Sequence, residues 1–217
     1  MVSDKDLKKV LDGKKNLVGV DLSGAHLEGT DFSNADLTDA NLRGANLSDA
    51  NLVWGYLDRA NLENANLRGA NLAWGYLDRA NLSDANLSYA DLTYAHLEGA
   101  HLEGAHLEGA NLEGVNLRNT VCNHAYLRNA DLTNADFTNA ILADAILSRV
   151  ILDNTNFTDT NLFQTDFRGT DLSNVEFTSF TSVWMIVDKK TYNSWTKDQQ
   201  KEHKMKRTDY MKIQEDF

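Results

Sequence analysis

A period of five residues runs through most of this sequence. From Leu17 to Phe177 every fifth position is Leu or Phe, and Cys122 is the one exception, so 32 of 33 positions fit without a shift of register. Two places before these positions, from Val20 to Val175, stand 20 Ala, 6 Thr, 4 Val and 2 Gly. A large and a small apolar residue therefore recur at fixed offsets, and the fold has to bury both.

Neither a helix nor a strand accommodates this spacing. Five residues advance about 140° around a helix, and on a strand an odd step places successive leucines on opposite faces. The chain is therefore expected to turn after each pentad. If each turn is about a right angle, four pentads close a square coil of about 20 residues whose Leu and Phe side chains point at the axis.

The position two residues after each Leu or Phe has the composition of a turn. Of the 32 such positions from Gly24 to Ser179, 9 are Gly, 8 are Asn and 5 are Asp. These residue types tolerate a positive φ angle better than others do. We therefore expect a corner with positive φ at each of these positions.

The resulting pattern A-[DN]-L-x-x, visible as ADLTD, ANLRG and ANLSD, closely resembles that of the pentapeptide-repeat family. The resemblance implies an all-β solenoid, a right-handed quadrilateral β-helix of about eight coils. The expected domains are an N-terminal capping helix over residues 1–15, the β-helix over residues 16–180 and a C-terminal cap over residues 181–217.

The N-terminal segment SDKDLKKVLD has the pattern of a short helix that covers the open end of a solenoid. Ser3 is suited to the N-cap, Leu7, Val10 and Leu11 would form one apolar face, and Gly13 is placed to end the helix. This segment is expected to shield the first coil from water.

The register ends after Phe177. Residues 183–187 are apolar and are expected to lie over the last coil, and residues 196–199 read as a capping box that opens a helix through residues 197–212. In some pentapeptide-repeat proteins the C-terminal segment makes a dimer. Both a monomer with a plain end cap and a C-terminally mediated homodimer therefore stay open.

The net charge of −11 disfavours direct binding to nucleic acid and favours a protein partner with a basic surface. When residues 16–180 are folded onto four faces, one face carries six acids and no base: Asp31, Asp91, Glu113, Asp131, Asp153 and Asp171. Such acidity could also serve only to keep the protein soluble.

The resemblance adds a second functional hypothesis. Quinolone-resistance members of the family, of the Qnr and MfpA type, are understood as DNA-shaped modulators of type II topoisomerases. Loops that interrupt the coil matter for protection in Qnr-type proteins of Gram-negative bacteria, whereas the register of this chain has no interruption. The main functional hypothesis is therefore a non-enzymatic rigid scaffold for protein–protein interaction, and DNA mimicry is the alternative hypothesis.

Aromatic residues are concentrated where one coil sequence is repeated. Residues 52–61 recur as residues 72–81 with a single change, so folding stacks Trp54 on Trp74 and Tyr56 on Tyr76. Outward rings are enriched at interfaces, although they could also merely stiffen a corner. The candidate partner-binding residues are Trp54, Trp74, Tyr94, Tyr56, Tyr76, Asp58, Asp78, Asp31, Asp91, Asp131 and Asp171.

A second outward patch is aliphatic and occupies positions that usually hold Asp or Asn. An exposed apolar collar of this kind suggests coverage by the tail or by a second chain. The candidate cap or dimer residues are Val121, Tyr126, Ile141, Ile146, Ile151, Val183, Trp184, Met185, Ile186 and Trp195.

Nothing in the sequence predicts an enzyme. Catalysis needs a concave pocket, whereas a filled square rod is convex. His96, His101 and His106 would lie on three successive sides of a coil, so they could not share a metal ion, and Cys122 would be a buried, unreactive thiol. We expect no cofactor and no metal. With no apolar run of membrane-spanning length and no signal-peptide pattern, we expect a cytoplasmic protein.

Overall fold

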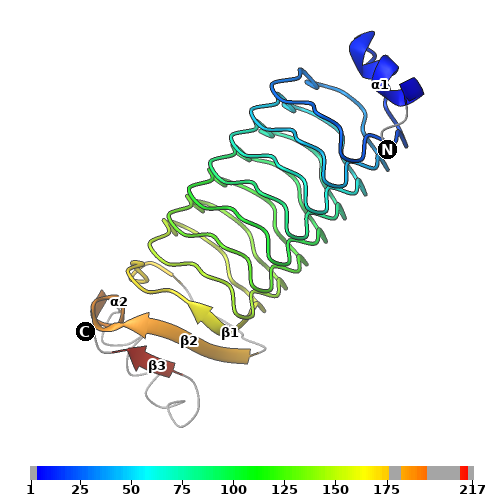
Figure 1. The fold of residues 1–217 in the computed structure, drawn as a ribbon. Helices are drawn as coiled ribbons and strands as arrows, with labels where there is room; N and C mark the ends of the chain where they lie inside the picture. The colour runs from blue at the N-terminus through cyan, green and yellow to red at the C-terminus, as the bar shows by residue number, and fades with distance from the viewer. Residues whose placement is uncertain (1–3, 176–181, 195–210, 215–217) are drawn as a thin grey trace.

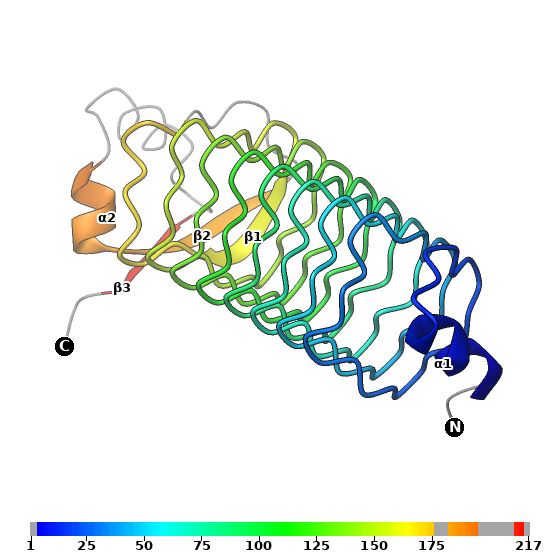
Figure 2. The same cartoon turned by 90° about the horizontal axis from the view of Figure 1, so that it is seen from above.

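The computed structural model of the protein describes residues 4–175, 182–194 and 211–214. A stack of coils leads from helix α1 (Asp4–Leu11) at one end to strands β1 (Asn161–Asp166), β2 (Ser182–Asp188) and β3 (Met211–Gln214) at the other, with helix α2 (Lys189–Ser194) after β2 (Figures 1 and 2). Within the described residues, neither helix is long and apolar enough to cross a bilayer.

The coils repeat every 20 residues. Every fifth residue from Asn16 to Ile146 forms a parallel bridge with the residue 20 positions later, as Asn41 does with Asn61. These bridges are isolated because each side of a coil contributes one paired residue before the chain turns. Continuous β-strands of four or more residues begin only with β1. Residues 20 positions apart therefore form columns that run along the stack.

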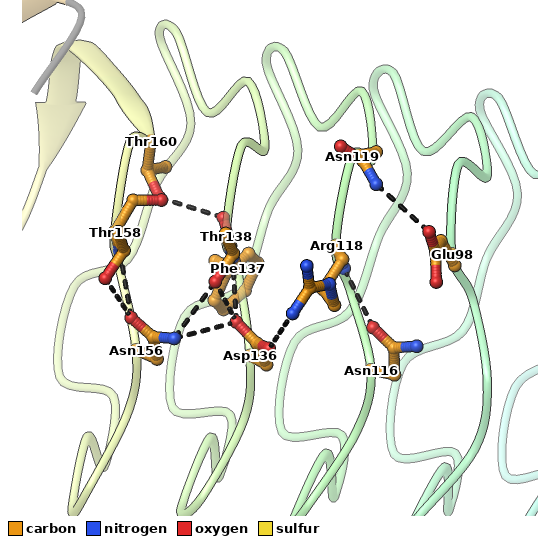
Figure 3. Close-up of polar contacts among 10 residues, drawn as sticks. All are labelled: Glu98, Asn116, Arg118, Asn119, Asp136, Phe137, Thr138, Asn156, Thr158 and Thr160. Carbon is orange, nitrogen blue, oxygen red and sulfur yellow. Dashed lines mark hydrogen bonds and ion pairs between the residues drawn. The ribbon is translucent and has the colours of Figure 1, made fainter.

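The backbone N–H groups of a pentad are bonded in a fixed pattern. The Asp or Asn donates to the coil before, the Leu and the corner residue donate to the coil after, and the small residue closes a turn onto its own Leu. The remaining N–H, two residues after the Asp or Asn, donates to that side chain. Arg43 N–H lies 3.3 Å from Asn41 Oδ1, and Arg118 N–H lies 3.1 Å from Asn116 Oδ1 (Figure 3).

The corners have the predicted backbone conformation. Every fifth residue from Gly19 to Gly169 has a φ angle between 54° and 73°. The prediction of positive φ is therefore confirmed from Gly24 to Gly169, including where the corner residue is Trp54 or Trp74. Asn174 is not among the residues with positive φ, and Ser179 lies outside the described residues.

The Leu and Phe side chains fill the axis of the stack. Leu92 is fully buried. Phe137 stacks on Phe157 in the next coil with 5.3 Å between ring centroids. Phe167, from the opposite side of the coil, packs against Phe157 in an edge-to-face arrangement with 6.0 Å between centroids. Burial of each such side chain contributes about 1.5–3 kcal/mol, so the stability of the coil is collective.

Threonine replaces alanine in the small inward position of the coil that contains β1. The four hydroxyls donate to main-chain carbonyls of the coil before at 2.7–2.9 Å, as Thr160 does to Phe137 O (Figure 3). Each threonine is buried, so the hydrogen bond offsets the cost of burying its hydroxyl: Thr155, Thr160, Thr165 and Thr170.

Helix α1 lies in the segment that the sequence predicts to be helical. Gly13 has a φ angle of 66° and its N–H donates to Val10 O at 2.9 Å, which ends the helix as expected. Leu7 and Val10 pack against the core, whereas Leu11 is 78% exposed. The prediction for Leu11 is wrong because this last helical residue faces away from the first coil. Ser3 lies outside the described residues.

Strand β2 continues the stack as a further rung and does not lie across its end. It pairs in parallel with β1, with Asn161 opposite Ser182 and Asp166 opposite Ile186. The chain then turns into α2, which the sequence did not predict. Met185 and Val187 are buried.

Strand β3 pairs in parallel with β2. The predicted helix through residue 212 is therefore wrong at Met211 and Lys212, because the open edge of β2 offers backbone partners that override local helix propensity. The capping box at residues 196–199 and the predicted helix up to residue 210 lie outside the described residues.

A charge at the axis should disrupt the stack. We expect Leu92→Asp to lower the melting temperature by more than about 10 °C, since it buries an unpaired carboxylate in a position that is fully enclosed. Asp84→Asn, which changes an exposed corner residue, should leave the melting temperature unchanged. Thermal unfolding followed by circular dichroism measures both, and an unaltered Leu92→Asp curve would refute the packing of the core.

Candidate functional site

Three aromatic rings form a ladder along one corner of the stack. Trp54 and Trp74 stack with 5.1 Å between centroids and 15° between planes, and Trp74 and Tyr94 stack at 4.5 Å and 28°. Their exposed fractions are 43%, 41% and 38%, so the rings cover one another's faces while their edges face solvent. We call Trp54, Trp74 and Tyr94 the corner ladder.

A second ladder lies on the adjoining side. Tyr56 stacks on Tyr76 at 5.0 Å and 5°, and Tyr76 stacks on His96 at 5.1 Å and 10°. The three residues are consecutive in one column of bridges. We call Tyr56, Tyr76 and His96 the side ladder, and the two ladders together the aromatic surface. The predicted stacking of these rings is confirmed.

Asp58 and Asp78 bond the backbone beneath this surface. Asp58 Oδ1 accepts the N–H of Asp78 at 3.1 Å, and Asp78 Oδ1 accepts the N–H of Glu98 at 2.8 Å. In pentads that have Asp or Asn two residues earlier, such as that of Asn116, this N–H is bonded by that side chain, a role that Tyr76 and His96 cannot fill. The sequence did not predict this role, although Tyr56 and Tyr76 are each followed by an Asp two residues later.

A shallow hollow of 390 Å³ lies beside the side ladder. Arg59 in its wall is already paired with Asp39 through two bonds of 2.7 Å, and Asn119 donates to Glu98 at 3.1 Å (Figure 3). Three carboxylates thus face two arginines, and one of these, Arg59, is neutralised by Asp39, which does not line the hollow. Its lining is Asp58, Arg59, Asp78, Arg79, Glu98, Gly99 and Asn119.

The Asp58 carboxyl is electrostatically unfavourable as an anion. Burial raises the pKa of Asp58 above its ordinary value, and the negative charge of Asp78 adds to this rise, against the opposing hydrogen bond from Asp78 N–H. At Asp39 the balance is reversed, because the hydrogen bond from Arg59 lowers the pKa of the Asp39 carboxyl.

The acids of the neighbouring face serve mainly the backbone. In each, the carboxylate accepts the N–H two residues later at 2.9–3.0 Å. They share one column with Asn and Ile residues, and Lys15 lies 3.6 Å from the first of them, so a base does contact this face. The structure spreads these four acids along the stack: Asp31, Asp91, Asp131 and Asp171. Only Asp91 shares a pentad with a residue of the aromatic surface, Tyr94.

The aliphatic collar is only partly covered. Tyr126, Ile141 and Ile151 are exposed by 37%, 37% and 50%, whereas Val121 and Ile146 are half-buried. Tyr126 also stacks on His106 at 4.6 Å. The exposed members stay candidates for contact with a further chain.

The tail residues predicted to join this collar are placed in part. Met185 is buried and Ile186 is half-buried within β2. Val183 and Trp184 belong to the backbone of β2, but their side chains, together with Trp195, lie outside the described residues.

The histidines and the cysteine have other partners than a metal. His101 Nδ1 lies 3.1 Å from Glu103, and His106 Nδ1 lies 3.3 Å from Glu108. In the part of the chain that the structure describes, no group of three or more His, Cys, Asp or Glu side chains is arranged so that it could hold a metal ion. Burial raises the pKa of the Cys122 thiol to about 12, so it is not a nucleophile at neutral pH.

A pH titration of two variants tests this electrostatic picture. Asp58→Asn keeps an oxygen that accepts the N–H of Asp78 but removes the carboxylate charge. Because the raised pKa of Asp58 means that this charge destabilises the folded state, we expect a higher melting temperature at pH 7. Ionisation of Asp58 costs stability only above its unfolded-state pKa, so the gain should fade as the pH drops to about 4.

Asp39→Asn is the matched control with the opposite sign. Its lowered pKa contributes stability that is present at neutral pH and lost as the pH falls through the folded pKa. We therefore expect a lower melting temperature at pH 7 and a shrinking difference in acid. A loss of stability in Asp58→Asn at pH 7 would contradict the assignment.

Comparison with known sequences identifies one matching family. A sequence family described as pentapeptide repeats matches with 8 copies in residues 16–52, 45–84, 80–119, 120–159 and 140–179. No curated protein matches the sequence.

Solved structures with similar folds come from several sources. HetL, a pentapeptide repeat protein involved in heterocyst differentiation regulation in the cyanobacterium Nostoc sp. strain PCC 7120, is 28% identical over 87% of this chain and 88% of its own, with a TM-score of 0.42. Rfr23 from the cyanobacterium Cyanothece 51142 is 27% identical over 75% and 94%, with a TM-score of 0.36. QnrB1, a plasmid-mediated fluoroquinolone resistance protein, is 18% identical over 78% and 86%, with a TM-score of 0.45.

Proposed function

The chain belongs to the pentapeptide-repeat family, and we propose that it is a non-enzymatic rigid scaffold for protein–protein interaction, built on the right-handed quadrilateral coil that the family resemblance implies. The observation that carries this proposal is the aromatic surface. Six rings in two ladders are held in register by backbone bridges, so a partner meets a large apolar area that loses little conformational entropy on binding.

The corner ladder occupies positions where the coil itself favours other residues. Trp54, Trp74 and Tyr94 have φ angles of 56°, 59° and 54°, a region that Gly, Asn and Asp tolerate best. Bulky residues held there cost of order 1–3 kcal/mol each. Stacking of the rings returns only about 0.5–1.5 kcal/mol per pair, so a role in binding accounts for the rings better than a role in folding.

The proposed partner has a basic surface. The hollow beside the side ladder presents Asp58, Asp78 and Glu98, and the chain as a whole has a net charge of −11. A Lys or Arg of the partner could reach these carboxylates while its neighbours contact the rings. Apolar anchoring and charge would then act at one place.

Exchange of the corner ladder for the residue that the corner favours tests the proposal. We expect the double variant Trp54→Asn, Trp74→Asn to lose at least tenfold in partner affinity, since buried aromatic anchors dominate such interfaces, while its melting temperature stays the same or rises. Quantitative affinity capture, with mass spectrometry to identify the protein recovered by the unaltered chain, measures the loss.

Tyr89→Asn is the matched control. Tyr89 is also an exposed aromatic residue at a positive-φ corner, with φ of 60° and 64% exposure, but it lies outside both ladders. It should leave recovery of the same protein intact. Equal recovery by the tryptophan double variant and the unaltered chain would remove the aromatic surface as the binding site.

The alternative is a DNA-mimicking modulator of a type II topoisomerase of the Qnr or MfpA type. The acid-rich face supports it, but Asp91 and Asp131 there bond their own backbone and alternate with Asn and Ile, unlike an even row of phosphates. Under the scaffold proposal, purified protein at micromolar concentration should neither inhibit nor protect DNA gyrase in a supercoiling assay. Either effect would favour the alternative.

A further inference from the structure

A second hollow, of 540 Å³, lies near the C-terminal end of the stack and differs in its charge from the hollow beside the side ladder. Four cationic side chains face one carboxylate there, although the chain as a whole has a net charge of −11. We call it the basic hollow. Its lining includes Arg128, Ser148, Arg149, Arg168, Asp188 and Lys190.

The coil geometry gathers these residues from distant parts of the sequence. Arg128, Ser148 and Arg168 are 20 residues apart and therefore follow one column through successive coils, which are about 4.8 Å apart. Arg149 stands at the adjoining corner with a φ angle of 59°. Lys190 enters from α2, directly after the rung that β2 adds to the stack.

The carboxylates near the basic hollow are already engaged. Asp166 pairs with Arg168 at 2.6 Å. Asp188 accepts the N–H of Gly169 at 2.8 Å and the N–H of Thr191 at 2.6 Å. No ion pair joins Arg128, Arg149 or Lys190 to an acid in the described ranges. The basic hollow therefore keeps positive charge that its own acids do not neutralise.

Ser148 gives an independent sign of a missing partner. The residue is only 7% exposed, and its Oγ is buried without a hydrogen-bond partner within the described part of the chain. A buried hydroxyl left in this state costs about 1–3 kcal/mol. Ser148 is one of the residues that line the basic hollow, so a ligand bound there is a candidate for the partner that its hydroxyl lacks.

We propose that the basic hollow binds a phosphate group carried by a small molecule, with Arg128 and Arg149 as charged donors, Lys190 as a further cation and Ser148 as a neutral donor. Guanidinium groups match the geometry of phosphate oxygens with two parallel hydrogen bonds. The volume of 540 Å³ is within the range of small-molecule sites and exceeds the need of a single phosphate. The ligand is therefore a phosphate monoester or a diphosphate.

This proposal does not depend on the scaffold function. The aromatic surface lies in the coils of residues 54–96, whereas the basic hollow begins at residue 128 and ends in α2. Acidic side chains elsewhere on the stack repel anions, so a phosphate compound should bind at this cluster and not along the rest of the surface.

Isothermal titration calorimetry with pyrophosphate at constant ionic strength tests the proposal on the full chain. We expect saturable binding with one site per chain. Arg149→Asn should weaken it roughly tenfold or more, the size expected for loss of a hydrogen bond to a charged group. Asn suits the positive φ of this corner, so the fold should persist. Arg128→Gln removes the other charged donor, which lies on a side of the coil and not at a corner, and should also weaken pyrophosphate binding.

The matched control is Arg79→Asn. Arg79 is also a corner arginine, with φ of 60°, but it lines the 390 Å³ hollow beside the side ladder. Arg79→Asn should therefore leave the affinity for pyrophosphate unchanged. Ser148→Ala should weaken pyrophosphate binding and at the same time raise the melting temperature of the free protein, because it removes the unpaired hydroxyl.

Three results would overturn the proposal. The first is the absence of saturable binding. The second is an equal loss in Arg149→Asn and Arg79→Asn, which would indicate attraction by charge alone. The third is tighter binding of citrate than of pyrophosphate, which would make the basic hollow a carboxylate site. A titration with inorganic phosphate in place of pyrophosphate tells whether the body of the ligand adds to the affinity, and weaker binding of the single phosphate is expected.

Discussion

The coil is held together by the hydrogen bonds that the backbone N–H groups of its pentads make. Four of the five are bonded within the turn or by adjacent coils, and the fifth is out of reach of any carbonyl. Where Asp or Asn precedes the Leu, its side chain supplies the missing acceptor, as Asn46 does for Ser48 at 3.2 Å. Since an unpaired buried N–H is costly, this residue is a part of the fold before it is a part of the surface.

The same constraint explains what happens where the pattern is broken. Tyr56, Tyr76 and His96 cannot supply the acceptor, and the carboxylates of Asp58 and Asp78 bond the N–H groups of the next coil in its place. In the side ladder, the aromatic column is therefore accompanied by acids that bond the backbone of the next coil. At the side ladder, apolar rings and negative charge therefore lie side by side for a structural reason, and the proposal of a basic partner rests on this combination.

The sequence predicted the parts of the fold that follow from periodicity. Bridges between residues 20 positions apart, positive φ at the corners and the stacking of Trp54 on Trp74 all follow from the spacing of five. It did not predict the rung formed by β2, the short helix α2 or strand β3, because these depend on pairing with an edge that exists only after the coils have formed. The roles of Asp58 and Asp78 were missed for a similar reason, since each acts on the coil after its own.

The distribution of charge matters more than its sum for what this surface can bind. Many of the acids that make the chain acidic are held by their own backbone, and Asn fills the same position in neighbouring coils without loss of the hydrogen bond. Such carboxylates add to the long-range field but have fewer oxygen lone pairs left for a partner. The groups that the coil does not use include the ring edges of the aromatic surface and, in the described residues, Arg128, Arg149 and Lys190 of the basic hollow, and the two proposals rest mainly on these groups. A rod whose surface is mostly committed to its own backbone can thus still carry two separate sites of opposite charge.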